Sequence, residues 1–272
     1  MPSVEALAPL ARTLRSLDPG AAPQAAAVCG SGLAAARRLV AVPGSFNPPH
    51  AAHLALMEAG LAAANAGAGA FVLSVRTVDK ERVSGMLLED RLWLLCRLAE
   101  EVAAATGGVV GAVATNRGLY VDQAAAIRRL CSNLVDLAFV VGYDKLVQIL
   151  DARYYDDRDA ALEALFARAR FLVAPRDGNA VEAIAALLAR PENARFAGRV
   201  RALPVSPALA RVSSTAARAA AAGGQPVAGV PPLVAAFVAA TGCYREPDGK
   251  GAYGRRAAEL EALLARPATT GN

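Results

Sequence analysis

The amino-acid sequence predicts an α/β protein built on a doubly wound parallel sheet with helices on both faces. Short apolar runs bounded by turn residues alternate along the chain with longer segments of helical spacing. The apolar runs are continuous, which is typical of strands buried on both faces of a parallel sheet. Alternation of this kind joins parallel strands through right-handed helical crossovers.

The elements follow one another in a regular order. Six apolar runs are expected to be strands, at residues 38–42, 70–75, 109–114, 134–141, 170–174 and 200–205. Five segments with helical spacing lie between them, at residues 51–65, 89–104, 121–130, 159–169 and 181–188. The Ala-, Gly- and Pro-rich piece 219–232 is expected to be a helix end followed by a connection. We therefore divide the chain into an N-terminal helical extension (1–36), a main α/β domain (37–245) and a C-terminal helical tail (246–272).

Composition limits the classes of partner. The net charge of +5 rests mostly on arginine, whose fixed fork suits phosphate. A GC-rich genome, which increases Ala and Arg alike, is nevertheless the favoured explanation of the overall bias. No aromatic–basic stripe or basic tail points to nucleic acid. The longest uncharged run, 219–244, is broken by glycines and prolines, so we expect no membrane span.

The cysteines bear on the compartment. Cys29, Cys96, Cys131 and Cys243 are scattered, without a CxxC pair or a neighbouring histidine. We expect reduced thiols in an intracellular protein, cytoplasmic or nuclear, and leave organelle targeting open. The number of subunits is also left open, a homo-oligomer included.

The two histidines of the chain, His50 and His53, lie together in GSFNPPHAAHL, residues 44–54. This stretch follows the first predicted strand and leads into the first predicted helix. Gly44 and Ser45 allow a tight turn with exposed backbone N–H groups, and the start of a helix favours an anion. Three residues apart on one helical turn, both imidazoles can donate hydrogen bonds to phosphate oxygens in the same crevice.

A second phosphate-binding pattern occurs far downstream, in RVSSTAAR at residues 211–218. Its serines and threonine stand at a helix start, where hydroxyl and N–H groups can hold phosphates. Arg218, one turn further on, can reach a β- or γ-phosphate. Taken alone, the pattern is only a good helix N-cap.

Together the two stretches resemble the HxGH nucleotidylyltransferases, the superfamily of adenylyl- and cytidylyltransferases. The first motif, G-x-F-x-P-x-H-x-G-H, is matched by Gly44, Phe46, Pro48, His50 and His53, while Ala52 stands where glycine is commonest. The second, ISSTxxR, is matched by Ser213, Ser214, Thr215 and Arg218. The resemblance covers about residues 39–222 and implies a Rossmann-like fold.

The resemblance also implies roles for other residues. LAFVVGYDKL resembles the family's G-x-D segment, so Gly142 and Asp144 would hold ribose or adenine; the alternative for Asp144 is a helix cap. Lys80 and Arg176 lie where the family binds substrate phosphate. Mg²⁺ would be carried by the ATP phosphates, because neither motif contains an acidic cluster.

The activity implied is transfer of AMP from ATP to nicotinamide or nicotinate mononucleotide by direct in-line attack, in which His50, His53 and Arg218 stabilise charge and no protein nucleophile is needed. Three alternatives stay open: another phosphorylated acceptor such as phosphopantetheine, or CTP with a phospho-alcohol; a nucleotide-binding regulatory protein without turnover; and ATP hydrolysis. The acidic residues between 151 and 159 are interpreted as a solvated connection, since their spacing does not fit a calcium loop.

Overall fold

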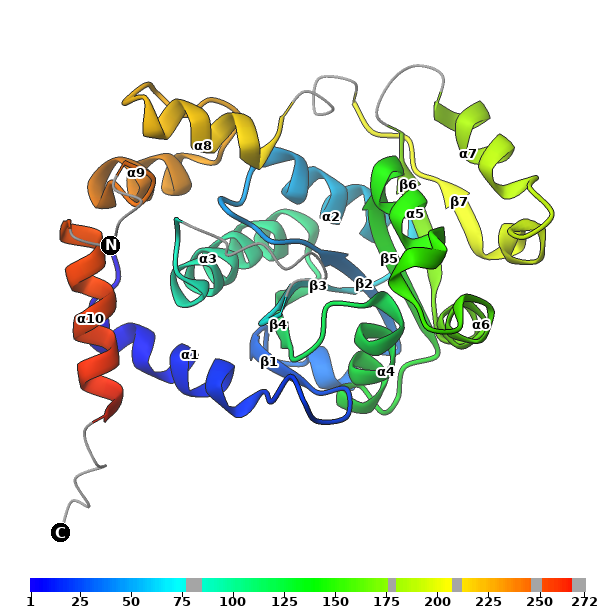
Figure 1. Cartoon of the computed structure of the whole chain (residues 1–272), viewed down its shortest axis with the longest axis horizontal. Coiled ribbons are helices and arrows are strands. Elements are labelled where there is room, and N and C mark those ends of the chain that lie inside the picture. The colour runs from blue at the N-terminus through cyan, green and yellow to red at the C-terminus, as the bar shows by residue number, and fades with distance from the viewer. Residues whose placement is uncertain (77–84, 176–179, 207–211, 246–250, 266–272) are drawn as a thin grey trace, which may run out of the picture.

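The computed structural model describes residues 1–76, 85–175, 180–206, 212–245 and 251–265. Within them the strands form one seven-stranded sheet, in the order β1-β4-β3-β2-β5-β6-β7 (Figure 1). The strands are β1 (Ala25–Cys29), β2 (Arg38–Pro43), β3 (Ala68–Ser74), β4 (Val109–Thr115), β5 (Asp136–Gly142), β6 (Arg170–Ala174) and β7 (Val200–Ala202). The strands from β2 to β7 pair in parallel, which confirms the predicted fold class.

All six predicted strands are present, and the differences lie at the edges of the sheet. β7 ends at Ala202, earlier than expected, and β1 was not predicted. β1 pairs antiparallel with β4, so the segment 1–36 is not purely helical as expected but contributes an edge strand. Its sequence AAAVC is mostly alanine, which is depleted in strands, and the pairing with β4 supplies what the local sequence lacks.

Helices cover both faces of the sheet. They are α1 (Val4–Ser16), α2 (Ala51–Ala64), α3 (Leu88–Thr106), α4 (Tyr120–Leu130), α5 (Tyr143–Leu150), α6 (Arg158–Arg168), α7 (Ala180–Leu188), α8 (Ser214–Ala222), α9 (Pro232–Thr241) and α10 (Ala252–Ala265), with short 3₁₀ turns at Leu33–Ala35, Ala152–Tyr154 and Ala194–Arg199. α1, α2 and α3 pack on the face that carries Val40 and Val42. α4, α5, α6 and α7 pack on the face that carries Leu39 and Ala41. No described helix has the length and apolar character that a membrane span requires.

The strand order reverses at β2. The chain proceeds from β2 to β3 and β4 on one side, then returns to place β5, β6 and β7 on the other. The loops that follow β2 and β5 therefore leave the sheet in opposite directions and open a crevice at its carboxyl edge, where sheets of this kind bind ligands. The histidine stretch follows β2, and the GYD stretch follows β5.

α2 lies close to the sheet at this reversal. A Cβ on Gly60 would lie 2.6 Å from Cγ2 of Val140 and 3.0 Å from Cγ1 of Val40, which belong to β5 and β2. Only the absence of a side chain permits this approach. The helix is thereby seated across the two strands that flank the crevice.

The C-terminal helices are part of the packed molecule. α8 and α9 bury Ala221, Val234 and Phe237 against Leu94 and Leu98 on the outer side of α3. α10 packs against α1 through Leu260, and the two helices cross at the left of the molecule in Figure 1. The connection expected at 219–232 is present between α8 and α9, whereas α9 itself was not predicted.

A buried polar cluster anchors α10 to α3. Asp90, which is fully buried, accepts hydrogen bonds from Arg256 Nη2 at 3.0 Å and from the Tyr253 hydroxyl at 2.6 Å. The same hydroxyl accepts from the Leu87 N–H at 2.8 Å. Pairing of this kind is required wherever a carboxylate is taken out of water.

The expectation of four reduced thiols is wrong for one pair. Cys29 and Cys96 form a disulfide, while Cys131 and Cys243 are free and buried. The unpredicted strand β1 explains the difference, because its pairing with β4 brings Cys29 beside α3. The two Cα atoms are 5.9 Å apart, within the range that a disulfide spans.

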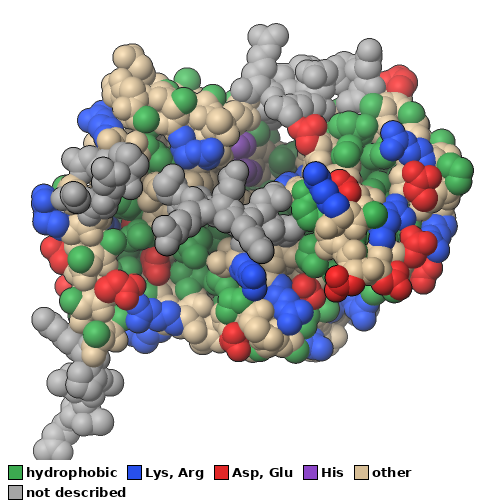
Figure 2. Space-filling model, viewed as in Figure 1, with side chains coloured by type: hydrophobic (Ala, Val, Ile, Leu, Met, Phe, Trp, Pro, Cys, Tyr) green, Lys and Arg blue, Asp and Glu red, His purple; other side chains and the backbone are tan. Residues whose placement is uncertain are grey.

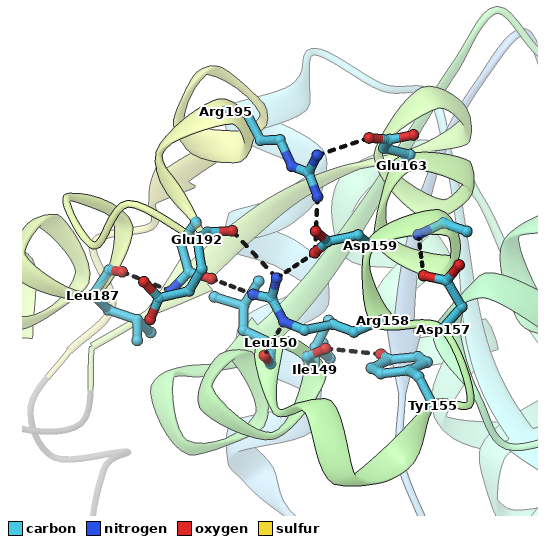
Figure 3. Close-up of polar contacts among 12 residues, drawn as sticks. Ile149, Leu150, Tyr155, Asp157, Arg158, Asp159, Glu163, Leu187, Glu192 and Arg195 are labelled. Atoms are coloured by element: carbon cyan, nitrogen blue, oxygen red, sulfur yellow. Dashed lines mark hydrogen bonds and ion pairs between the residues drawn. The ribbon is translucent and has the colours of Figure 1, made fainter.

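The acidic segment between α5 and α6 carries exposed carboxylates around an inward-pointing arginine (Figure 3). Arg158 donates to the carbonyl oxygens of Leu150 and Glu192 and pairs with Asp159, which also pairs with Arg195. Asp157 caps α6 by accepting from the Ala160 N–H at 3.0 Å. Among the described residues no group of three His, Cys, Asp or Glu side chains is placed to hold a metal ion. The segment thus joins α5 to α6 through the 3₁₀ turn at Ala152–Tyr154.

Candidate active site

The loop after β2 begins as an extension of the sheet. Gly44 donates its N–H to the Val72 carbonyl oxygen at 3.1 Å, which continues the pairing with β3. Phe46 then adopts a φ of +47°, a conformation that costs a non-glycine residue free energy. Its fully buried ring lies edge-on to Phe71 and 4.7 Å from the His53 ring, measured between centroids. Burial of the Phe46 ring therefore stabilises the unusual backbone conformation of the turn.

The two histidines start α2 as a stacked pair. His50 is the N-cap and His53 the third residue of the helix, and their ring centroids are 3.6 Å apart. The His50 N–H donates to His53 Nδ1 at 3.0 Å. Because Nδ1 accepts, the proton of a neutral His53 is on Nε2, which is left as a donor. His50 Nδ1 is buried and has no hydrogen-bond partner among the described residues.

Burial keeps both imidazoles neutral. His50 is 8% exposed, and burial lowers its pKa to about 4. The pKa of His53 is also well below its usual value, first through burial and then through the nearby charge that His50 would carry. At physiological pH the pair therefore offers neutral N–H donors at the positive end of a helix.

The second motif meets the first directly. Ser214 Oγ donates to the Pro48 carbonyl oxygen at 2.9 Å, and Arg218 Nη1 donates to the Asn47 carbonyl oxygen at 2.8 Å. Ser213 caps α8 by accepting from the Ala216 N–H. Residues 166 and more positions apart in sequence thus form one hydrogen-bonded unit.

Two helix N-termini, those of α2 and α8, therefore meet at this loop. Thr215 Oγ1 accepts from Arg218 Nη2 at 3.2 Å, which fixes the guanidinium across the start of α8. In Figure 2 the histidine side chains, coloured purple, are recessed in a hollow of the face shown. Neutral N–H donors, hydroxyl groups and one arginine gathered at two helix N-termini form a site suited to a chain of phosphates.

We compared the chain with family models, with curated proteins and with solved structures. No family model matches the chain, but the other two comparisons found relatives. A solved structure titled as Plasmodium falciparum nicotinic acid mononucleotide adenylyltransferase complexed with NaAD superposes with a TM-score of 0.53 at 13% identity, over 76% of this chain and 97% of that one, which supports the fold. A Schizosaccharomyces pombe protein assigned as a nicotinamide mononucleotide adenylyltransferase is 27% identical over 135 residues, 49% of this chain and 51% of that protein.

A bacterial relative decides the family. A Stenotrophomonas maltophilia (strain K279a) protein assigned as a nicotinate-nucleotide adenylyltransferase is 31% identical over 227 residues, which cover 75% of this chain and 95% of that protein. This chain belongs to the nicotinate-nucleotide adenylyltransferase family. It is a nucleotidyltransferase, and its fold is the Rossmann-like fold that the resemblance implied.

In this family member, the G-x-D segment lies across the crevice from the histidines. Gly142 ends β5 and is the N-cap of α5, and a Cβ placed on it would meet no described atom within 4 Å. Asp144 is exposed in the first turn of α5; the N-cap position, considered as its alternative role, belongs to Gly142. The space beside Gly142 is open, and the Asp144 side chain is exposed near the end of β5.

Two predicted residues of the family pattern, Lys80 and Arg176, lie outside the described residues. Ala52, which replaces the commonest glycine of the family motif, lies in the first turn of α2 and is partly exposed.

The structure adds one residue that the family motifs did not indicate. Arg91, on α3, is 2% exposed and donates to the Ser45 carbonyl oxygen at 3.2 Å and twice to the Met86 carbonyl oxygen. Burial lowers its pKa, yet no described carboxylate pairs with it. The sequence held a signal for it, because Arg91 falls in line with Leu95, Leu98 and Val102 on the apolar stripe of the helix.

Proposed function

We propose that the protein transfers AMP from ATP to nicotinate or nicotinamide mononucleotide, giving a pyridine dinucleotide and pyrophosphate. One observation carries the proposal: Ser214 and Arg218 of the second motif donate to the backbone of the loop that carries the histidine pair, at the sheet's reversal point, in a chain that belongs to this family. In this proposal the two motifs hold the triphosphate, and the GYD stretch, which follows the neighbouring strand β5, holds a second group.

The reaction we propose is a single in-line displacement. A phosphate oxygen of the mononucleotide attacks the α-phosphorus of ATP, and the bond from that phosphorus to the bridging oxygen breaks. The electron pair of that bond leaves with pyrophosphate, so no protein nucleophile takes part. The protein's share of the work is to place the two phosphates and to stabilise the charge that builds up between them.

The α-phosphate would lie against the start of α2. His53 Nε2–H and a ring N–H of His50 donate to its non-bridging oxygens, together with the backbone N–H groups of Ser45 and Phe46. The Gly44 N–H bonds to the Val72 carbonyl oxygen, so Gly44 contributes the tight turn rather than a donor. Because both imidazoles are already neutral and desolvated, they need no deprotonation and little reorganisation before they donate.

The β- and γ-phosphates would lie at the start of α8. Ser213, Ser214 and Thr215 supply hydroxyl and N–H donors there, and Arg218 turns part of its fork from Asn47 or Thr215 toward the departing pyrophosphate. Gly142 and Asp144 would hold ribose or adenine, and Lys80 and Arg176 a substrate phosphate.

Mg²⁺ fits this arrangement as a companion of ATP. The described residues hold no group of three potential metal ligands, and the donor set at both motifs consists of N–H and hydroxyl groups. The ion would accordingly be held by the phosphates, where it neutralises their charge.

The test is incubation of the protein with ATP, Mg²⁺ and a panel of phosphorylated acceptors, with products identified by mass. The panel contains nicotinate and nicotinamide mononucleotide, phosphopantetheine, and a phospho-alcohol supplied with CTP. We expect a pyridine dinucleotide and an equal amount of pyrophosphate, and the two kcat/KM values rank the acid against the amide.

Other outcomes point to the alternatives. If product forms only from an acceptor without a pyridine ring, the proposed substrate is wrong and that acceptor takes its place. Release of ADP or AMP without a joined product would indicate hydrolysis, and ATP binding without any release a regulatory protein. A variant with both His50→Ala and His53→Asn controls for a contaminating activity.

A further inference from the structure

Asn47 lies in the middle of residues 44–50, the loop between β2 and α2, which we call the phosphate loop. It is held by two segments that are remote in sequence. It is 2% exposed. Arg218 holds its carbonyl oxygen, and the Tyr244 hydroxyl donates to its Oδ1 at 2.7 Å. Tyr244 follows α9, 197 residues further along the chain, and lies outside both sequence motifs.

The position of Tyr244 is tightly determined. A Cβ on Gly85 would lie 2.5 Å from Cε1 of the Tyr244 ring and 3.4 Å from Asn47 Oδ1. Gly85 has a φ of +106°, so both its conformation and the closeness of the ring require glycine. Burial raises the pKa of Tyr244, so its hydroxyl stays protonated and keeps its proton to donate.

We propose that Tyr244 is a positioning residue for AMP transfer, acting through Asn47. The proposal rests on the proposed function. Asn47 stands between Phe46, with its positive φ, and Pro48, whose carbonyl oxygen holds Ser214. A shift of Asn47 therefore moves the backbone donors of the loop on one side and the start of α8 on the other.

This role has a kinetic signature. A loop that moves by a fraction of an ångström still binds ATP through many contacts, but it no longer meets the charge that forms at the α-phosphorus. The loss is expected in kcat, with little change in the KM for ATP. A purely structural tyrosine would lower stability and leave both constants unchanged.

Tyr253 provides a matched control. It belongs to the same C-terminal part of the chain and its partly buried hydroxyl also makes strong hydrogen bonds, but to Asp90 and Leu87 rather than to Asn47. Tyr253→Phe and Tyr244→Phe each remove one hydroxyl and keep the ring. Only the second touches the phosphate loop.

The experiment compares the two variants in steady-state kinetics and in amide hydrogen exchange. Tyr244→Phe should lower kcat by about tenfold, with the KM for ATP within about twofold of the wild type. Exchange should quicken at the amides of His50, Ala51 and His53, which are hydrogen-bonded in this loop. Tyr253→Phe should unfold more easily, with kcat and the exchange of these amides unchanged.

A double variant tests the route through Asn47. Once Asn47→Ala has removed the acceptor, adding Tyr244→Phe should change kcat no further. Additive losses would overturn the proposal, as would wild-type kcat and exchange in Tyr244→Phe. If the wild type uses another acceptor, the proposed function fails and the same comparison is made with that acceptor. If the wild type transfers AMP to no acceptor, faster amide exchange at His50, Ala51 and His53 in Tyr244→Phe would support the positioning role of Tyr244, and unchanged exchange would contradict it.

Discussion

The two nitrogens of His53 have different tasks at the scale of the single residue. Nδ1 accepts the hydrogen bond of the His50 N–H and so closes the first turn of α2. Nε2 carries the proton and is the atom we expect to face the α-phosphate. One side chain thus combines a structural acceptor with a functional donor, and substitution can separate them.

His53→Asn should separate them. The asparagine oxygen can still accept from the His50 N–H, but nothing replaces the donor at Nε2. We expect kcat to fall by about 100-fold, the usual loss for one such donor, while the unfolding temperature changes little. Steady-state kinetics with thermal unfolding would measure both, and a full transfer rate at saturating substrates would contradict the role of His53.

The stability of the protein should depend on pH through His50. An unfolded histidine titrates near about 6.5, whereas the folded pKa of His50 is about 4. Between these values the unfolded chain binds more protons, so stability is fully present above pH 6.5 and is lost as the pH falls. The loss attributable to His50 between pH 7 and pH 5 is about 1–2 kcal/mol.

Urea unfolding at both pH values would measure this loss. His50→Asn, which keeps a good helix N-cap, should show a smaller decrease than the wild type. An equal decrease in both proteins would show that His50 is not the group responsible.

At the scale of elements, the site is the contact between the start of α8 and the loop after β2. Arg218 makes this contact with one arm of its guanidinium, on the Asn47 carbonyl oxygen, while the other arm bonds to Thr215 of its own helix. A lysine at this position would keep the charge but could not span both oxygens in the same way.

Arg218→Lys should therefore raise the KM for ATP by about tenfold, because the charge remains and its placement is lost. Arg255→Lys, an exposed arginine on α10, is the matched control and should leave the KM unchanged. Equal KM values in Arg218→Lys and the wild type would exclude a role for the fork.

Elements differ in how well the sequence predicts them. β2 to β6 were predicted because each is a self-contained apolar run, and the loop with His50 and His53 because its motif is continuous. β1 and α9 were missed, since alanine-rich segments take their structure from neighbours far along the chain. Tyr244 escaped prediction for the same reason, because it reaches the loop through a contact that no local pattern records. Arg91 stood out only as a charge on an apolar stripe, and its partner Ser45 came from the fold.

At the scale of the whole molecule, the Cys29–Cys96 disulfide ties the edge strand β1 to α3, the helix that carries Arg91. It closes a loop of 67 residues, for which the chain-entropy model gives a stabilisation of about 4 kcal/mol.

Reduction should accordingly lower the unfolding temperature, and Cys29→Ser with Cys96→Ser should reproduce the effect. Thiol titration in denaturant should count two thiols before reduction, Cys131 and Cys243, and four afterwards. Four thiols before reduction, with the same unfolding temperature, would show that the pair is not bonded in solution.

The seat of α2 on the sheet has a consequence for the position of the histidines. Gly60 is two helical turns from His53, on the side that touches Val40 and Val140. A methyl group there would clash with these valines and push α2 away from the sheet. Both imidazoles, which are fixed to the start of the same helix, would move with it. A residue outside both phosphate motifs therefore governs how closely the helix that carries the histidines approaches the sheet.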